Sequence, residues 1–397
     1  MKVLILGAGS VGRQLAHLTK SLPLIKKITI ADRYKERALQ TAHPIQAEGI
    51  ELNVLNQVQL RRSMEKVDLV ISTVGPCSRF GKIILETAVL ARRCYIDVSD
   101  DPLPTLEMLT LNQVAQTAGI LAIIGMGASP GITNMLAVEA GVRLDHVDRI
   151  VTGWGSQGHE DEDMSEARTD SAALDHWVDQ VSGKIPVWQN YQCVQEPPLK
   201  KKKIYYPGSG FTNAYTVGHP EAITLVRRFP ELRESLNVMD FSSYVISCLK
   251  AVGAAVDCGA LSPADGSKKL GHLLSGEPKD LRNILSYTWH GLKDSLRIHE
   301  NWLPPFFAVA EGSKDGKNKI VGACLAGTLE GCMAKQTAIP TAIAIDMMSR
   351  REIPGKGVKP PETALNSDMF FQKLLPFLNE STRTPLSSAT RITIESL

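Results

Sequence analysis

Paired cysteines, long apolar runs and a large net charge are all missing from this 397-residue chain. The seven cysteines are scattered without a Cys-x-x-Cys pair, which argues against a disulfide framework and against a zinc site. No apolar run is long enough to span a bilayer. The net charge of +2 gives no strong field to attract nucleic acid or a membrane surface. We therefore expect no metal, no nucleic-acid partner and no membrane association.

A targeting leader is also not expected, because a strand begins within two residues of Met1. Together with the unpaired cysteines, this favours a cytoplasmic, reduced protein. Apolar residues make up 43% of the chain and charged residues 22%, which is the balance of an ordinary globular protein. The length predicts two to three domain-sized units.

A glycine-rich turn is the most informative segment that is present. The apolar strand 2–6 is followed at once by a G-x-G-x-x-G pattern and then by a helix. A dinucleotide pyrophosphate needs this order, because the three glycines allow a tight turn, a close approach of backbone to phosphate, and packing of the helix on the strand. The phosphates then lie at the positive end of the helix. The predicted cofactor contacts in this turn are Gly7, Gly9, Ser10, Val11 and Gly12.

The second strand, 27–31, ends in a carboxylate, Asp32. A carboxylate at this place can accept both hydroxyls of the adenosine ribose and would repel a 2′-phosphate, which favours NAD. The adjacent Arg33 could instead pair with that phosphate and favour NADP, or stack on the adenine. We expect NAD, with NADP as the alternative.

Strands and helices alternate through the first 130 residues. Further strands are expected at 50–54, 67–72, 94–98 and 121–124, and helices at 35–41, 57–64, 82–91 and 104–118. This alternation predicts an α/β dinucleotide-binding domain over 1–130, built on a doubly wound parallel sheet. The Gly- and Pro-rich run 125–131 then breaks the pattern and marks the domain boundary.

The pattern changes after this boundary. We expect a helix at 132–142, a strand at 149–154, a polar acidic loop at 158–170, a helix at 171–181, strand-like stretches to about 250, and last strands within 317–333. This mixture predicts a second, α+β domain with a mixed sheet over 131–335. The lysines 200–203 predict a solvated turn rather than a nucleic-acid patch, because no aromatic residues are interleaved with them. An apolar helix over 337–348 follows, and the tail is polar enough to fray.

Four segments together give the chain a family resemblance. They are the glycine turn with Asp32, the pair 72–77 and 94–101, the segment 127–134, and the helix at 338–342 followed by 357–362. In these segments the chain resembles the saccharopine dehydrogenase family, which includes lysine 6-dehydrogenase, carboxynorspermidine dehydrogenase and homospermidine synthase.

The resemblance implies an N-terminal Rossmann domain and a mixed α/β substrate domain through which members form homodimers. It also implies a C-terminal helical segment, 336–380, that packs on the first domain ahead of a polar tail, 381–397. The reaction implied is hydride transfer between a nicotinamide and the carbon that bears an amine. Members that form saccharopine or carboxynorspermidine have an aspartate where this chain has Ser129, so those two activities are not implied. Members similar to lysine 6-dehydrogenase also lack this aspartate.

Candidate site residues in the first domain follow the ends of strands, where such sheets bind ligands. The expected contacts with the nicotinamide and its ribose are Thr73, Val74, Gly75 and Val98. Asp100 is the first candidate to exchange a proton with the substrate nitrogen or to hold the charged substrate, and Asp97 is the second. Helix capping before Pro102 is the alternative for Asp100 and its neighbour Asp101.

Four further residues complete the candidate site. Cys77 could act as acid or base if its pKa were lowered, or could be a small buried hydrophobe. Arg79 could hold a substrate carboxylate, or be an exposed arginine. In the second domain, His219 is a candidate proton donor and Glu221 could neutralise a substrate ammonium, with a solvated loop as the alternative.

Three functions are compatible with these features. The first is an NAD(P)-dependent oxidoreductase that acts on a small amino acid or amine. The second is a transferase like homospermidine synthase, which uses NAD as an internal catalyst; the acidic run 160–163 would then line a polyamine path. The third is a non-catalytic NAD(P)-binding protein, since Ser129 replaces the aspartate and no acid–base pair is evident.

Overall fold

The computed structural model describes residues 1–155, 172–274, 303–379 and 386–396. The chain divides into two compact units. The first comprises Met1–Val138 and Ala326–Thr390, and the second comprises Glu139–Leu325 and Arg391–Leu397. The chain therefore leaves the first unit, builds most of the second, and returns.

A parallel sheet of seven strands forms the centre of the first unit, in the order β16-β6-β5-β4-β1-β2-β3. The strands are β1 (Lys2–Leu6), β2 (Lys27–Asp32), β3 (Glu48–Glu51), β4 (Leu69–Ser72), β5 (Cys94–Asp97), β6 (Leu121–Ile123) and β16 (Gly357–Lys359). The order reverses between β1 and β4, and ligands bind such sheets at the carboxyl ends of the strands beside this reversal. The predicted doubly wound fold is thus confirmed. The seventh strand, β16, is not predicted by the sequence.

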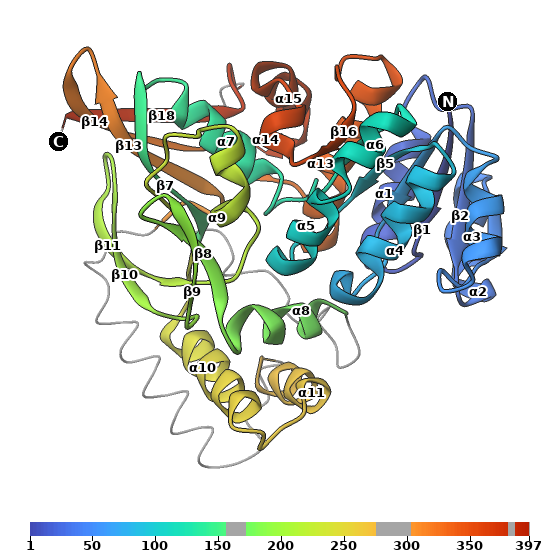
Figure 1. The fold of residues 1–397 in the computed structure, drawn as a ribbon, viewed down its shortest axis with the longest axis horizontal. Helices are drawn as coiled ribbons and strands as arrows, with labels where there is room; N and C mark the ends of the chain where they lie inside the picture. The colour runs from blue at the N-terminus through green and yellow to red at the C-terminus, as the bar shows by residue number, and fades with distance from the viewer. Residues whose placement is uncertain (156–171, 275–302, 380–385, 397) are drawn as a thin grey trace. The chain divides into compact units, whose positions relative to one another are not determined.

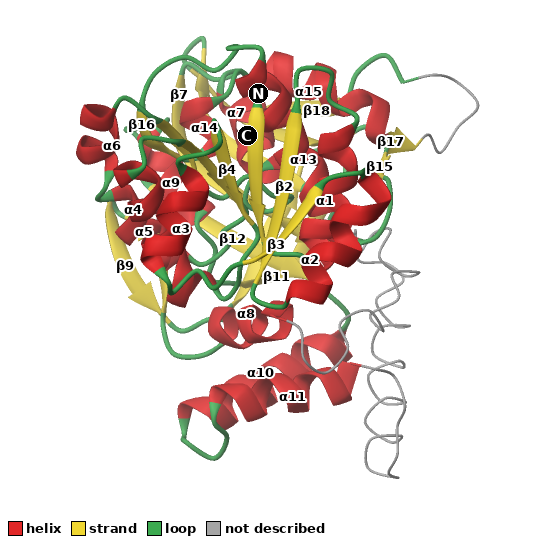
Figure 2. Cartoon of the chain, turned by 90° about the vertical axis from the view of Figure 1, so that its right-hand side faces the viewer, coloured by secondary structure: helices red, strands yellow, loops and turns green. Residues whose placement is uncertain are grey.

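Helices cover both faces of this sheet, as Figure 2 shows for α1 and α2 on one side and α3 and α4 on the other. The helices of this unit are α1 (Ser10–Lys20), α2 (Lys35–Ala42), α3 (Gln57–Met64), α4 (Cys77–Leu90), α5 (Pro102–Leu109), α6 (Asn112–Ala118), α13 (Met333–Ser349), α14 (Pro361–Ala364) and α15 (Ser367–Leu374). Helix α7 (Ile132–Gly141) begins in the first unit and ends in the second. Leu4, Leu6 and Val70 of the sheet pack with Leu60 of α3 and Leu85 of α4 in one buried core. Helix α13 lies against α1, so the returning segment completes the opposite layer.

Some element bounds differ from those predicted. Helix α4 begins at Cys77 rather than at 82, because Pro76 occupies its N-cap and Gly81 is tolerated inside it. A Cβ at Gly81 would lie 2.4 Å from the Cys77 sulfur, so the missing side chain makes room for that thiol. The stretch predicted as one helix over 104–118 is two helices, α5 and α6. Helix α13 begins at Met333 and carries Pro340 inside it rather than at its start.

A mixed sheet forms the centre of the second unit, and its main path is β10-β11-β12-β7-β13-β14-β18. Its strands are β7 (His146–Gly155), β8 (Ile185–Gln189), β9 (Gln192–Glu196), β10 (Lys201–Tyr206), β11 (Gly210–Thr216), β12 (Glu234–Asp240), β13 (Phe307–Lys314), β14 (Lys317–Leu325) and β18 (Thr390–Ser396). Strands β12 and β7 are parallel, whereas β13 is antiparallel to both β7 and β14. This confirms the mixed sheet predicted for the second domain.

Three helices lie near one end of these strands, as Figure 1 shows. They contribute residues to one apolar core of this unit. They are α8 (Ala172–Val181), α10 (Ser243–Asp257) and α11 (Pro263–Leu274), and the short α9 (Glu221–Thr224) precedes β12. The run of strands that was predicted to continue to about 250 ends instead with β12 at Asp240, and α10 follows it.

The lysine run and the C-terminal tail also differ from expectation. Lys201, Lys202 and Lys203 lie in strand β10 rather than in a turn, where Lys201 and Lys203 are exposed and Lys202 is half-buried. The tail, predicted to fray, contributes β18 to the sheet. The acidic loop 158–170 lies outside the described residues. Within the described residues, no helix combines the length and the apolarity that a bilayer crossing demands.

Candidate functional site

The glycine turn connects the end of β1 to the start of α1. Gly7 has a φ of +96°, a conformation that favours glycine. Gly9 is the N-cap of α1, makes no side-chain cap, and the first helical turn carries no acidic residue. The first N–H groups of a helix lack intrahelical partners, and the helix dipole favours an anion near them. This end of α1 is thus electrostatically suited to a phosphate.

The space around the three glycines tests whether a dinucleotide fits this turn. A Cβ added at Gly12 would lie 2.0 Å from the carbonyl oxygen of Gly7, and one added at Gly7 would lie 2.7 Å from Oγ1 of Thr73. Both glycines are therefore required by the fold itself. A Cβ at Gly9 would meet no atom within 4 Å. Gly9 thus lines open space at the helix N-terminus, where a pyrophosphate would lie in this fold.

Asp32 lies at the end of β2 and is bonded to the glycine turn. Its Oδ2 accepts the backbone N–H of Ala8 at 2.8 Å, and its Oδ1 accepts that of Tyr34 at 2.9 Å. Each carboxylate oxygen has a second lone pair, so ribose hydroxyls can still be accepted. Asp32 therefore shapes the turn in addition to the ribose contact predicted for it.

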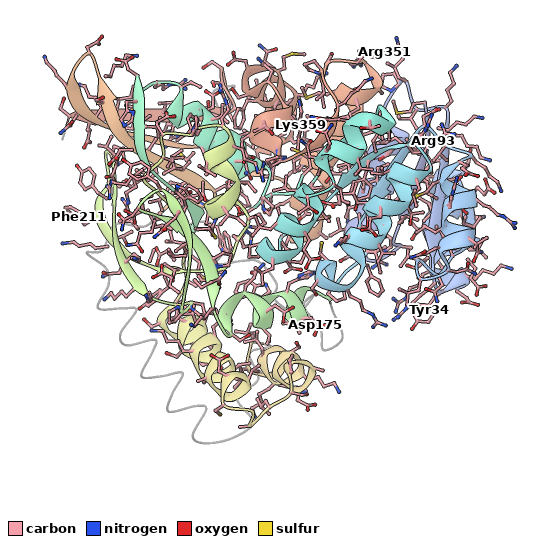
Figure 3. The ribbon with its side chains drawn as sticks, in the orientation of Figure 1. Tyr34, Arg93, Asp175, Phe211, Arg351 and Lys359 are labelled. Carbon is pink, nitrogen blue, oxygen red and sulfur yellow. The ribbon has the colours of Figure 1, made fainter. Side chains whose placement is uncertain are left out.

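Two arginines flank Tyr34 just beyond Asp32. The guanidinium carbon of Arg33 lies 4.6 Å from the centre of the Tyr34 ring, and that of Arg37 lies 4.9 Å from it. Tyr34, labelled in Figure 3, is 45% exposed. Within the described residues, neither arginine forms an ion pair. Two cations without a carboxylate partner next to the ribose position are suited to a 2′-phosphate.

The segment after β4 supports the turn from the neighbouring strand. The Thr73 hydroxyl donates to the carbonyl oxygen of Leu6 at 3.0 Å, and the Thr73 N–H donates to the same carbonyl. Val74 packs partly buried against the core of the sheet. Gly75 precedes Pro76, the N-cap of α4. The structure thus places Thr73, Val74 and Gly75 at the strand end predicted for them, with Thr73 holding the glycine turn.

Asp97 ends β5 and is buried, with 3% of its surface exposed. Its Oδ1 accepts the N–H groups of Ser99 and Gly125, and its Oδ2 accepts the Tyr95 hydroxyl at 3.0 Å. Burial raises the pKa of Asp97 to about 6, although these hydrogen bonds oppose the rise. Asp97 thereby ties the end of β5 to the end of β6, and Val98 follows it at the same edge.

Cys77 opens α4 and lies beside the segment that follows β5. It is buried, and the Ser99 hydroxyl donates to its sulfur at 2.6 Å. Burial raises the pKa of the Cys77 thiol well above its usual range, and the charge of Asp97 adds to the rise. The thiol is therefore neutral, and its surroundings favour the buried-hydrophobe alternative over an acid–base role.

Asp100 and Asp101 follow β5 at the start of α5. Asp101 is the N-cap residue of α5, yet its side chain makes no cap hydrogen bond. It is buried, whereas Asp100 is half-buried. The Asp101 side chain therefore does not cap α5, and the capping alternative is wrong for this residue. Arg79 is exposed in the first turn of α4, and its guanidinium lies over the Phe80 ring.

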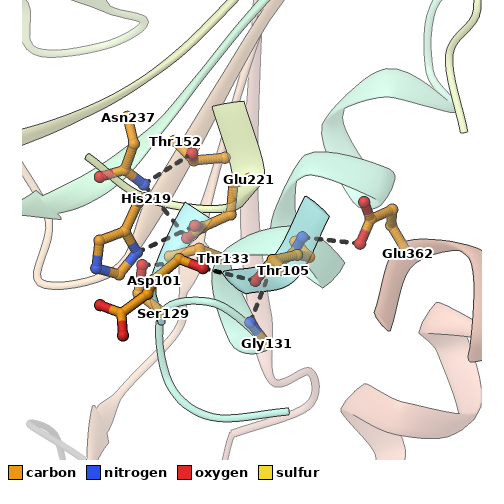
Figure 4. A network of polar contacts seen from close by, with 11 residues as sticks. Asp101, Thr105, Ser129, Gly131, Thr133, Thr152, His219, Glu221, Asn237 and Glu362 are labelled. Atoms are coloured by element: carbon orange, nitrogen blue, oxygen red, sulfur yellow. Dashed lines mark hydrogen bonds and ion pairs between the residues drawn. The ribbon is translucent and has the colours of Figure 1, made fainter. Parts of the chain in front are cut away.

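A polar network fixes the Gly- and Pro-rich segment after β6. Gly131 has a φ of +125°, and a Cβ there would collide with the carbonyl of Gly127. The Gly131 N–H donates to Oδ1 of Asn134, and Nδ2 of Asn134 donates to Glu362 of α14 at 2.8 Å. The Thr133 hydroxyl donates to that of Ser129 at 3.3 Å. Figure 4 labels Ser129, Gly131, Thr133 and Glu362 of this network.

A second polar network lies in the other unit. His219 and Glu221 are both buried, and Nδ1 of His219 lies 3.1 Å from Oε2 of Glu221. Nδ2 of Asn237 donates to Oε1 of Glu221 at 3.3 Å and to the Thr152 hydroxyl at 3.0 Å. These contacts are dashed in Figure 4. The Trp154 ring lies 4.7 Å from that of His219, centre to centre. His219 therefore does not lie in a solvated loop.

Sequence reasoning assigned no role to Asn134, Glu362, Thr152 or Asn237. The available signal is a polar residue within an apolar run. Asn237 lies in the run Leu236 to Met239, and a lone amide there indicates a buried partner. The sequence alone does not say which partner that is.

Comparisons with known proteins agree with this geometry. Residues 3–123 match the family model described as the saccharopine dehydrogenase NADP binding domain. Carboxyaminopropylagmatine dehydrogenase of Synechocystis is 23% identical over 271 residues, which are 64% of this chain and 65% of that protein. Saccharopine dehydrogenase [NADP(+), L-glutamate-forming] of Pyricularia oryzae is 29% identical over 138 residues, 34% of this chain and 29% of that protein. The matches thus span less than two thirds of either relative's length.

A solved structure shares the fold over nearly the whole chain. The apo saccharopine dehydrogenase (L-Glu forming) from Saccharomyces cerevisiae has a TM-score of 0.64 at 15% identity, and the match covers 99% of both chains. The predicted family resemblance is confirmed, as is the prediction of a nicotinamide-dinucleotide-binding domain. Residues 3–123 thus match a saccharopine dehydrogenase-type NADP-binding domain, and the chain shares the fold of that solved saccharopine dehydrogenase.

Proposed function

We propose that this protein is an NAD(P)-dependent oxidoreductase that transfers a hydride at a C–N bond of a small amino acid or amine. The observation that carries the proposal is the glycine turn, where Gly9 lines open space at the N-terminus of α1. The names of its relatives, which are dehydrogenases of amino-acid and amine compounds, support the substrate class. The family resemblance supports a homodimer, and the scattered cysteines support a reduced, cytoplasmic protein.

The residues that would hold the cofactor follow from the geometry. The turn from Gly7 to Gly12 would hold the pyrophosphate, and Asp32 the ribose. Asp32 supports NAD, whereas Arg33 and Arg37, which form no ion pair in the part of the chain that the structure describes, support NADP. We propose that the site accepts both cofactors. The bound nicotinamide would supply the hydride chemistry.

The protein's own part is to move a proton at the substrate nitrogen and to hold the substrate's charge. Asp100, whose neighbour does not cap α5, is one candidate for these roles. His219 is the other, because Glu221 fixes its ring and can stabilise its charged form. Both Glu221 oxygens contact groups of the protein, Oε2 the His219 ring and Oε1 the Asn237 amide, so we propose that Glu221 orients His219 rather than binding the substrate ammonium directly.

A binding and turnover experiment tests the proposal. The purified protein is first titrated with NADH and with NADPH by calorimetry, and dissociation constants within about tenfold of each other are expected. Amino acids, keto acids with amines, and polyamines are then offered while reduced nicotinamide is followed by its absorbance. Net formation or loss of reduced cofactor supports the oxidoreductase.

Other results select the alternatives. Turnover of a polyamine without net redox change would favour a transferase that uses NAD internally. Binding with no turnover across the panel would favour a non-catalytic nucleotide-binding protein. A protein that binds neither nucleotide would refute all three readings.

A further inference from the structure

A buried row of polar side chains in the second unit carries a further inference. We propose that Asn237, held by Thr152, is a positioning residue that fixes the Glu221 carboxylate against His219 and thereby decides which ring nitrogen of His219 carries the proton. Its consequence for turnover rests on the proposed function. The protonation pattern itself is a property of the protein without cofactor or substrate.

The Glu221 carboxylate is a charged group that lies away from water. The Glu221 side chain is 0% exposed, and a buried carboxylate is costly unless it is paired and hydrogen-bonded. Its two oxygens have different partners, His219 on Oε2 and Asn237 on Oε1. An apolar residue would often be at least as stable at such a place. A buried ionisable pair that is kept nonetheless is typical of a functional site.

The Asn237 amide is oriented by the Glu221 carboxylate. An ionised carboxylate only accepts hydrogen bonds, so the amide must turn its nitrogen toward Glu221. Both N–H groups of that nitrogen are used, one by Glu221 and one by the Thr152 hydroxyl. Within the described residues, the carbonyl oxygen of Asn237 is buried with no hydrogen-bond partner. The amide thus leaves an acceptor unsatisfied in order to donate to this carboxylate.

The sheet gives the Asn237 amide a rigid support. Asn237 and Thr152 are directly paired in the parallel ladder of β12 and β7, and both are fully buried. His219 and Glu221 instead lie in the connection that follows β11 and in the first turn of the short α9. The sheet therefore fixes the donor, and the donor fixes a carboxylate that lies on a less regular segment.

The contact of Glu221 with Nδ1 of His219 determines which ring nitrogen carries the proton. A carboxylate on Nδ1 retains the proton on that nitrogen, because an acceptor cannot face the lone pair of an unprotonated nitrogen. Neutral His219 is then the Nδ1–H tautomer, and Nε2 is the basic nitrogen. The Trp154 ring, tilted by 59° to the imidazole, limits rotation of His219. A proton donor with one defined basic nitrogen suits transfer to or from an amine.

The experiment is long-range ¹H–¹⁵N NMR of the histidine ring nitrogens in the cofactor-free full chain, with His219 assigned from a His219→Gln variant. The wild type is expected to show the Nδ1–H tautomer when neutral. Asn237→Leu should shift the tautomer equilibrium about twofold to tenfold toward Nε2–H, the loss expected for one hydrogen bond. Thr152→Val, which keeps the shape of the strand, should shift it in the same direction by less.

The matched control is Ser235→Ala on the same strand. Ser235 is fully buried, and within the described residues its hydroxyl has no partner. This variant removes a buried polar group at a comparable place, so the His219 signals should be unchanged. Tautomer shifts of equal size in Ser235→Ala and Asn237→Leu would show a general loosening of the sheet and would overturn the proposal, as would an unchanged tautomer in both Asn237→Leu and Thr152→Val.

The consequence for turnover is tested separately. With any substrate that passes the panel above, Asn237→Leu should lower kcat about tenfold and change its pH profile while KM stays near the wild-type value. A tautomer shift with unchanged kcat and pH profile would refute the positioning role in catalysis. Failure of the panel itself would refute the oxidoreductase and leave the NMR result standing.

Discussion

Replacing Gly9 with alanine separates the needs of the fold from the needs of the cofactor. The added Cβ would meet no protein atom within 4 Å, so the folded protein has room for it. Gly9 has a φ of −72°, which alanine adopts without strain. The small loss of N-cap quality and the stiffer unfolded chain oppose each other, so the free energy of unfolding should change by less than about 1 kcal/mol.

The effect on nucleotide binding should be larger. If the pyrophosphate fills the space beside Gly9, the new methyl group overpacks that contact, at a cost of about 1–3 kcal/mol. The dissociation constant should then rise about tenfold to a hundredfold. Calorimetric titration with NADH and NADPH measures the affinity, and urea unfolding followed by circular dichroism measures the stability.

Gly12→Ala is the matched control on the same turn. Its Cβ would lie 2.0 Å from a backbone oxygen, a clash that no side-chain rotation can relieve. This variant should lose stability by about 1–3 kcal/mol as well as affinity. If Gly9→Ala binds both nucleotides as tightly as the wild type, the phosphate does not pass over Gly9 and the assignment of the turn is refuted.

Three further perturbations test other parts of the first unit. Burial raises the pKa of Asp97 to about 6, so its contribution to the free energy of unfolding is present at low pH and lost as the pH rises through this value. In urea titrations, the free energy of unfolding of the wild type relative to Asp97→Asn should therefore fall by about 2 kcal/mol from about pH 4.5 to about pH 7.5. A difference that does not vary with pH would contradict this. Arg33→Ala and Arg37→Ala should each weaken NADPH binding about tenfold and leave NADH binding within about twofold; equal losses for both cofactors would show that the arginines do not bind a 2′-phosphate. Thr73→Val removes a hydrogen bond to the carbonyl of Leu6 and should cost about 1 kcal/mol of unfolding free energy, which chemical denaturation measures; an unchanged stability would mean that the bond contributes nothing.

Local sequence was a good guide wherever a pattern repeats along a continuous segment. The helix predicted over 57–64 has those bounds in the structure, because Asn56 caps it and its apolar spacing is regular. The glycine turn was predicted correctly because Gly7 and Gly12 meet local backbone needs, whereas Gly9 leaves open space at the helix N-terminus. The start of α4 could not be predicted from the sequence, because Gly81 inside the helix indicates a break there. The structure shows that the Cys77 sulfur occupies the space that a side chain at Gly81 would need.

Residues distant in the chain escaped prediction for a different reason. Strand β16 has three residues and joins the sheet through Gly357, paired with Leu121, and no local pattern marks so short a strand. The pairing of Asn134 with Glu362 and of Asn237 with Thr152 joins residues far apart in sequence. Their side-chain types were visible, but their neighbours were not.

The sequence by itself determined that this chain has a dinucleotide-binding sheet, because the strand, glycine turn, helix and carboxylate are local features with local physical causes. Tertiary structure alone decided what the polar residues do. It made Cys77 a neutral buried thiol, engaged Asp97 with backbone amides, and placed a sheet amide on the Glu221 carboxylate. Charge and hydrogen bonding depend on burial and on neighbours in space, and those are set only when the strands pair.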